Sequence, residues 1–228
     1  MLKIPREDRE ILRNLLRDYD NGIGNKVEPK EAMQRIRRGL IEICQTNYFC
    51  GLELKFSRSH SSNGLLLTQN GYFVTCFHCI ENGIKNLIIV DDDGNSYPIE
   101  GVCACSKDKD IAIAKAKINN VRKHIVYRYD KFQTKNQLYL SLSRWNEKVL
   151  AKGTHFVGTV KINSTGVTYL GSKNHSKPGD SGSIIANING GIASLLHGTG
   201  YDDPLDTNKT TVSISFMLII DLMRQICK

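Results

Sequence analysis

The sequence predicts an antiparallel all-β fold, a barrel or a sandwich, with helices before and after it. From about residue 50 onward, short runs rich in leucine, aromatic and β-branched residues are separated by turn signals: Asn70-Gly71, Asp93-Gly94 and Asn189-Gly190. Many short strands at this spacing are typical of antiparallel barrels and sandwiches. Both ends of the chain differ from this middle part, because their apolar residues follow helical spacing.

Two helices are predicted at the start of the chain. In REDREILRNLLRDYDNG, one helical face carries the apolar residues Ile11, Leu12, Leu15, Leu16 and Tyr19. The segment DNGIGN interrupts this pattern. In EPKEAMQRIRRGLIEICQ, which has a proline near its start, helical spacing resumes through Met33, Ile36, Leu40 and Ile43.

These patterns divide the chain into two expected parts. We expect an N-terminal helical extension over residues 1–45 and a β domain over residues 46–228, which ends in a helix at FMLIIDLMRQICK. The apolar stripe of the extension is a separate helical stripe, so we expect the extension to be dispensable for the core of the β domain. It is then either a docking element for a regulatory partner or a packed extension.

Composition limits the classes of function. No apolar run reaches 18 residues, and the first residues, MLKIPREDRE, are charged from the start, so we expect neither a membrane span nor a signal peptide. Seven cysteines without a secretion signal predict free thiols in a reducing, cytoplasmic compartment. The net charge of +8 is spread along the chain, which favours a solvated surface over a nucleic-acid interface and gives no sign of a membrane partner.

The segment KPGDSGSII contains a candidate nucleophile, Ser181. Gly179 and Gly182 permit a tight turn that would expose the serine hydroxyl beside backbone N–H groups. Gly, Asp and Ser are also the commonest turn formers, so an ordinary turn between strands remains the alternative. The choice between them depends on whether the chain also supplies a base and a group to orient that base.

Two further residues fit those roles. His78 follows a strand pattern that runs through Tyr72, Val74 and Cys76, and Asp110 comes directly before the alternating strand in KDKDIAIAK. A serine hydroxyl is a poor nucleophile until a base takes its proton. Imidazole can accept and return that proton near neutral pH, and a carboxylate fixes its tautomer.

Taken together, these segments resemble chymotrypsin-fold (PA clan), trypsin-like serine proteases. Within that group, their sequence pattern is most similar to the protease domain of the HtrA (Deg) type. NGLLLTQNGYFVTCFHCI resembles the family's segment leading to V-T-x-x-H-V, and DKDIAIAK resembles D-x-A-x-L-K. KPGDSGSIIANINGGIASL resembles N-P-G-N-S-G-G-x-x-x-N-x-x-G-x-x-x-G. TTVSISFMLIIDLMRQI resembles the closing strand and helix, so the resemblance covers about residues 50–225.

The resemblance implies a double six-stranded antiparallel β-barrel and a serine endopeptidase that needs no cofactor and cleaves proteins or peptides. It implies His78 as general base, Asp110 as its orienter and Ser181 as nucleophile, with the backbone N–H groups of Gly179 and Ser181 as oxyanion hole. The chain departs from the pattern in having Asp180 where Asn is usual and in lacking a PDZ-like segment and an I-V-G-G start. A catalytically silent β-barrel that binds proteins is the alternative.

Four cysteines admit a different interpretation. Cys76, Cys79, Cys103 and Cys105 could supply thiolate ligands to zinc, since the first pair has C-x-x-C spacing. C-x-C spacing is less usual, and strand residues two apart face the same side without any metal. We therefore expect no metal and reduced core cysteines, with the zinc alternative left open.

The resemblance also indicates residues of the substrate pocket. His175 would lie at its base, Lys177 nearby, and Leu196 or His197 on its wall. A strict count from the Asn189-Gly190 turn gives the wall position to Leu196, and a β-bulge would be needed to bring in His197. The local positive charge, to which Lys173 adds, predicts a preference for Glu, Asp or Gln before the cut. A pocket set by Leu196 would instead favour small apolar residues.

Overall fold

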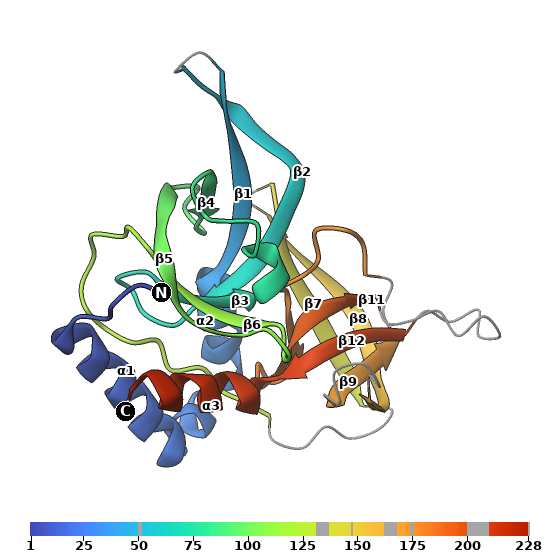
Figure 1. The fold of residues 1–228 in the computed structure, drawn as a ribbon. Coiled ribbons are helices and arrows are strands. Elements are labelled where there is room, and N and C mark those ends of the chain that lie inside the picture. Colours follow the sequence, from blue (N-terminus) through green and yellow to red (C-terminus); the bar gives the residue numbers. More distant parts are fainter. Residues whose placement is uncertain are drawn as a thin grey trace.

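The computed structural model describes residues 1–49, 52–130, 137–146, 148–161, 168–173, 176–199 and 210–227. These residues form two closed six-stranded antiparallel barrels, with helices at the N-terminal side and one at the C-terminal end (Figure 1). This arrangement confirms the predicted double-barrel fold. Within the same residues, no helix is long and apolar enough to cross a membrane.

The first barrel has the strand order β1-β2-β3-β6-β5-β4. Its strands are β1 (Leu40–Phe49), β2 (Leu52–Leu66), β3 (Tyr72–Cys76), β4 (Leu87–Val90), β5 (Ser96–Ser106) and β6 (Ile111–Ala116). Strands β3 and β6 are buried along their whole length, as their apolar sequences require. They pair antiparallel with Cys76 opposite Ile111, so the end of β3 and the start of β6 meet at one edge of the barrel.

The second barrel has the order β10-β11-β12-β9-β8-β7. Its strands are β7 (Leu138–Trp145), β8 (Lys148–Lys161), β9 (Thr168–Lys173), β10 (Ile184–Asn187), β11 (Ile192–Thr199) and β12 (Thr210–Ser215). The predicted C-terminal helix is α3 (Phe216–Ile226), and its first turn is capped by the Ser215 hydroxyl, which accepts from the Met217 N–H.

The first N-terminal helix agrees with the sequence prediction, and the second is shorter than predicted. Helix α1 spans Arg6–Asp20, a 3₁₀ turn spans Ile23–Lys26, and α2 spans Pro29–Gly39. The expected continuation of the second helix to about residue 45 is wrong, because β1 begins at Leu40. Leu40 is extended (φ −67°, ψ 126°), and a Cβ at Gly39 would collide with the Tyr127 hydroxyl. The apolar residues from Leu40 to Ile43 serve as barrel strand instead of helix face.

The helices also share the barrel core, so the expectation that their stripe is separate from it is wrong. Leu12, Leu15 and Ile36 are fully buried in one apolar cluster with residues of both barrels and α3. Tyr19 of α1 makes edge-to-face contacts with Tyr129 at 5.6 Å and with Phe216 at 5.8 Å between ring centroids. In Figure 1, α1 and α3 accordingly lie side by side below the first barrel.

Candidate active site

His78 and Asp110 meet at the edge where β3 ends and β6 begins. His78 lies in a 3₁₀ turn (Phe77–Cys79), and Asp110 is the last residue of the turn before β6. Asp110 has a positive φ of 52°, a conformation that aspartate tolerates better than most residues. Its Oδ2 lies 2.7 Å from His78 Nδ1, and its Oδ1 accepts the His78 backbone N–H at 2.8 Å. Because an ionised carboxylate only accepts hydrogen bonds, Nδ1 carries the proton and Nε2 is left facing the other way.

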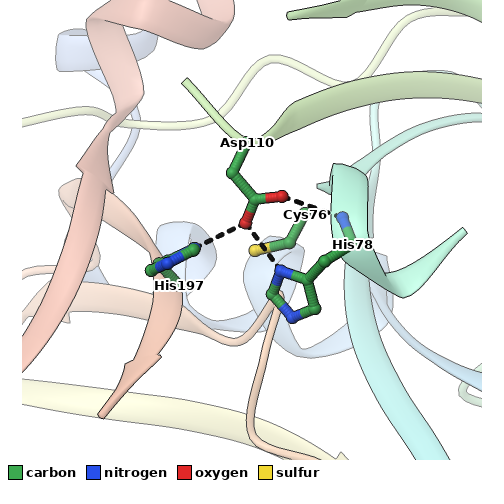
Figure 2. A group of neighbouring side chains, drawn as sticks. All are labelled: Cys76, His78, Asp110 and His197. Carbon is green, nitrogen blue, oxygen red and sulfur yellow. Dashed lines mark hydrogen bonds and ion pairs between the residues drawn. The ribbon is translucent and has the colours of Figure 1, made fainter. Parts of the chain in front are cut away.

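A second imidazole shares the same carboxylate oxygen. His197 Nδ1 lies 2.5 Å from Asp110 Oδ2, and its ring stands edge-on to that of His78 at 5.4 Å between centroids (Figure 2). The pairing of β11 with β12 shifts between Leu196 and Gly198, so His197 occupies a β-bulge. The bulge that would be needed to bring His197 into the substrate pocket therefore occurs. It turns the His197 side chain to Asp110.

Ser181 lies in the turn between Pro178 and β10, and it belongs to the second barrel. Gly179 and Gly182 have φ values of +98° and +82°, which other residues resist. A Cβ at Gly182 would collide with the backbone carbonyl of Asn63. Ser181 and His78 line one cleft of about 480 Å³. In the structure the Ser181 hydroxyl donates to the His197 carbonyl at 3.0 Å.

The backbone N–H groups around Ser181 fall into two sets. Those of Asp180 and Gly182 donate to the carbonyls of Lys177 and Leu196. Among the described residues, the N–H groups of Gly179 and Ser181 have no acceptor. These two donors, in a loop that lines the cleft, are available to a developing negative charge.

Asn63 holds this loop from the first barrel, and the sequence analysis missed it. It is 1% exposed, its Nδ2 donates to the Gly179 carbonyl at 2.9 Å, and its backbone N–H donates to the Ser181 carbonyl at 2.7 Å. Its Oδ1 accepts the backbone N–H of Arg144 at the end of β7. One buried amide thus ties the candidate nucleophile loop to both barrels.

Asp180 is anchored as well. Its Oδ2 accepts from Lys152 Nζ and from the backbone N–H of Lys177, both at 2.9 Å. The sequence analysis noted Asp180 as a departure from the resembled pattern but did not find Lys152, which comes from β8.

The charges around Asp110 shift the pKa values of the site. Burial alone would raise the pKa of Asp110, but the hydrogen bonds from His197 and His78 lower it to about 2. Asp110, and after it Cys79, raise the pKa of His78 to about 10. The neighbouring Cys76 lowers the pKa of Cys79 against the effect of burial, and His78 adds to this lowering. Asp110 therefore stays ionised at neutral pH and stabilises the protonated form of His78, so the ring can act as a base only in the fraction of molecules that have lost the Nε2 proton, a fraction that grows as pH rises.

The residues proposed for the substrate pocket differ in how far they are buried and in whether they line the cleft. Leu196 is fully buried in a cluster with Tyr139, Ile185 and Ala193 and does not line the cleft. Lys177 is exposed beside the nucleophile loop. His175 lies outside the described residues, as does the side chain of Lys173. The substrate roles given to Lys177, His175, Leu196 and His197 stay predictions.

The four cysteines do not form the zinc set considered above. Among the described residues, the group that could hold a metal combines Cys76 with His78, Asp110 and His197, whose ligand atoms all lie within 4.8 Å of one another. Cys79, Cys103 and Cys105 are outside it and carry free thiols.

Comparison with known proteins supports the fold. No protein-family model matches the chain, and no curated protein matches it. Among solved structures, it is similar to the serine endoprotease from Yersinia pestis, with a TM-score of 0.65 at 14% sequence identity. The match covers 88% of this chain and 67% of that one. The fold is therefore the chymotrypsin-type double barrel found in a serine endoprotease.

Proposed function

We propose that this protein is a serine endopeptidase that cleaves protein or peptide substrates through Ser181, His78 and Asp110. The observation that carries the proposal is the geometry of His78. Its Nδ1 is fixed on the buried Asp110, while its side chain and Ser181, from the other barrel, line the same cleft. The order of the three motifs also supports a protease of the HtrA type in particular.

The proposed reaction begins when the Ser181 hydroxyl rotates from the His197 carbonyl toward His78 Nε2. Nε2 takes the hydroxyl proton as Ser181 Oγ bonds to the substrate carbonyl carbon, and the carbonyl oxygen becomes an oxyanion. The N–H groups of Gly179 and Ser181, which have no acceptor within the described part of the chain, would stabilise that charge. His78 then gives the proton to the leaving amine, and water releases the acyl group by the reverse proton path. His197 acts as a positioning residue, since its Nδ1 contacts the Asp110 carboxylate and its ring packs edge-on against His78.

A fluorophosphonate probe tests the proposal. An activated serine displaces fluoride from phosphorus and keeps the phosphonyl group, so we expect one adduct per chain, on the peptide that contains Ser181. A His78→Ala variant removes the base and should not be labelled. A folded wild-type chain that the probe does not label would contradict the proposal and favour a silent β-barrel that binds proteins.

We further propose a preference for Glu, Asp or Gln immediately before the cut. Lys177, exposed beside the nucleophile loop, supports it, because a carboxylate that enters a pocket needs a cationic partner. In a peptide library, cleavage mainly after Arg or Lys would contradict this preference. Cleavage after small apolar residues would contradict it equally.

The Lys152–Asp180 pair gives a further prediction. Replacing Lys152 with methionine leaves the Asp180 carboxylate, next to the nucleophile, without its cation. The pair is partly exposed, so we expect a moderate loss in kcat/KM, roughly five- to tenfold. Lys148→Met is the matched control, since Lys148 is an exposed lysine of the same strand and has no ion pair among the described residues. Equal losses in both variants would show that the ion pair of Lys152 with Asp180 does not matter.

A further inference from the structure

The residues around Asp110 include two donors that the proposed proton relay does not use. Cys76 and His197 belong to different barrels, yet their Sγ and Nδ1 atoms converge on the same carboxylate as His78 Nδ1 (Figure 2). A serine peptidase needs only one imidazole on this carboxylate. One thiol, two imidazoles and one carboxylate are, however, the donor types that zinc prefers at a four-coordinate site.

We propose that Cys76, His78, Asp110 and His197 bind a zinc-type divalent cation, and that the bound cation switches off the peptidase. The binding half of this proposal concerns the four donors alone. The inhibitory half rests on the function proposed above.

The distances fit a site that closes on the metal with small movements. Tetrahedral zinc with sulfur, nitrogen and oxygen ligands keeps its donor atoms roughly 3.2–3.7 Å apart. Asp110 Oδ2 lies 2.7 Å from His78 Nδ1 and 2.5 Å from His197 Nδ1. Each of these distances would have to increase by up to about 1 Å when the metal binds. No pair of donor atoms is more than 4.8 Å apart, so the widest gaps close by a similar amount.

Burial and charge also suit a cation. Cys76 is fully buried and Asp110 is 7% exposed, whereas the side chains of His78 and His197 are 37% and 28% exposed and leave a route from solvent. One thiolate and one carboxylate would neutralise a divalent ion. That balance favours binding at a site that is largely shielded from water.

The protons that leave on binding explain the inhibition. The Cys76 thiol, which donates to the Leu196 carbonyl, loses its proton to solvent because a coordinating thiol is deprotonated. Each imidazole binds the metal through Nδ1 as the neutral tautomer with its hydrogen on Nε2, so a ring that starts with its hydrogen on Nδ1 passes that proton to solvent while Nε2 takes one up. His78 Nε2 then carries a hydrogen and cannot accept the Ser181 proton. The metal would therefore act from behind the imidazole, without entering the substrate cleft.

Binding can be tested without activity in a full-length Ser181→Ala variant, which keeps all four donors. We expect calorimetric titration with Zn²⁺ to give one ion per chain. Adding His197→Gln or Cys76→Ser should weaken Zn²⁺ binding by about tenfold to 100-fold or more. Replacing residues that only hydrogen-bond to metal ligands already lowers metal affinity by that range. His124→Gln is the matched control, because His124 pairs with Asp18 elsewhere and should leave the affinity unchanged.

Titration with Co²⁺ adds a readout of the thiolate. A sulfur-to-cobalt charge-transfer band is expected with Ser181→Ala and should vanish with Cys76→Ser, while His197→Gln, at the more exposed donor, covers the case in which Cys76→Ser does not fold. Absence of Zn²⁺ binding, or binding unchanged by both ligand variants, would overturn the site. In the wild type, Zn²⁺ should inhibit cleavage at the concentrations that saturate Ser181→Ala, and a chelator should restore it.

The experiments distinguish a failure of the metal-site proposal from a failure of the peptidase proposal. If Zn²⁺ binds through Cys76 and His197 in a chain that no fluorophosphonate labels, the metal site stands and the peptidase proposal fails. If the chain is labelled and active while saturating Zn²⁺ leaves cleavage unchanged, the inhibitory half is wrong.

Discussion

Replacing Ser181 with alanine is expected to lower kcat for peptide cleavage by about 10⁴-fold or more, the loss seen when a nucleophile is removed from such a triad. The substitution deletes the attacking oxygen and leaves the cleft and the hydrogen bond between His78 and Asp110 in place. Binding of a peptide should therefore persist while its cleavage stops. Steady-state cleavage and direct binding of the same peptide measure the two effects.

The matched control for this change is Ser183→Ala on the same loop. The Ser183 hydroxyl is buried and has no hydrogen-bond partner among the described residues, so its removal breaks no interaction. This variant should keep kcat close to that of the wild type. If Ser181→Ala retained most of the activity, another residue would have to be the nucleophile.

Arg144 gives the largest expected effect on stability. Its side chain is fully buried, and its guanidinium donates to the carbonyls of Leu40 and Arg37 and to Asp92 Oδ1, at 2.7, 3.0 and 2.5 Å. These carbonyls lie at the end of α2 and the start of β1, where helical hydrogen bonds run out. Arg144→Met leaves them and the carboxylate without this donor, so we expect the free energy of unfolding to fall by about 3–5 kcal/mol. Urea unfolding followed by circular dichroism measures it.

Arg37→Met controls for the charge. Arg37 approaches the same Asp92 carboxylate, at 3.9 Å, but its side chain is 71% exposed. An exposed ion pair contributes about 0–1 kcal/mol, so this variant should unfold nearly as the wild type does. Similar losses in both variants would mean that the net charge near Asp92, and not the buried hydrogen bonds of Arg144, sets the stability.

The sequence predicted most strands because alternation and turn residues are local signals. The start of β1 was missed because Leu40 and Ile43 fit helical spacing, while pairing with the distant strand β2 and, at Ile43, also with β4 makes them extended. The packing of α1 was missed because an apolar stripe indicates that one face of a helix is buried but does not identify the elements that bury it.

For the candidate site, His78, Asp110 and Ser181 could be proposed from the sequence because each lies at a strand edge in a motif whose order resembles that of a known family. The contact of His197 with Asp110 depends on a bulge beside Gly198, which the sequence allows but does not require. Asn63 resembles a turn residue in SSNG, and its role appears only when the second barrel docks on it. Lys152 and Asp180 are far apart in the chain, so their pairing leaves no local pattern.

The division of the site between the barrels has a consequence for biosynthesis. A chain synthesised as far as Trp145 already contains His78, Asp110 and the buried amide of Asn63, but neither Ser181 nor the carbonyls that this amide holds. The proposed nucleophile, Ser181, is synthesised after the whole first barrel, and its loop is held by hydrogen bonds from Asn63 of that barrel. On the function proposed above, a ribosome-bound chain that ends at Trp145 therefore cannot cleave peptides, because it has the base and the residue that orients it without the nucleophile.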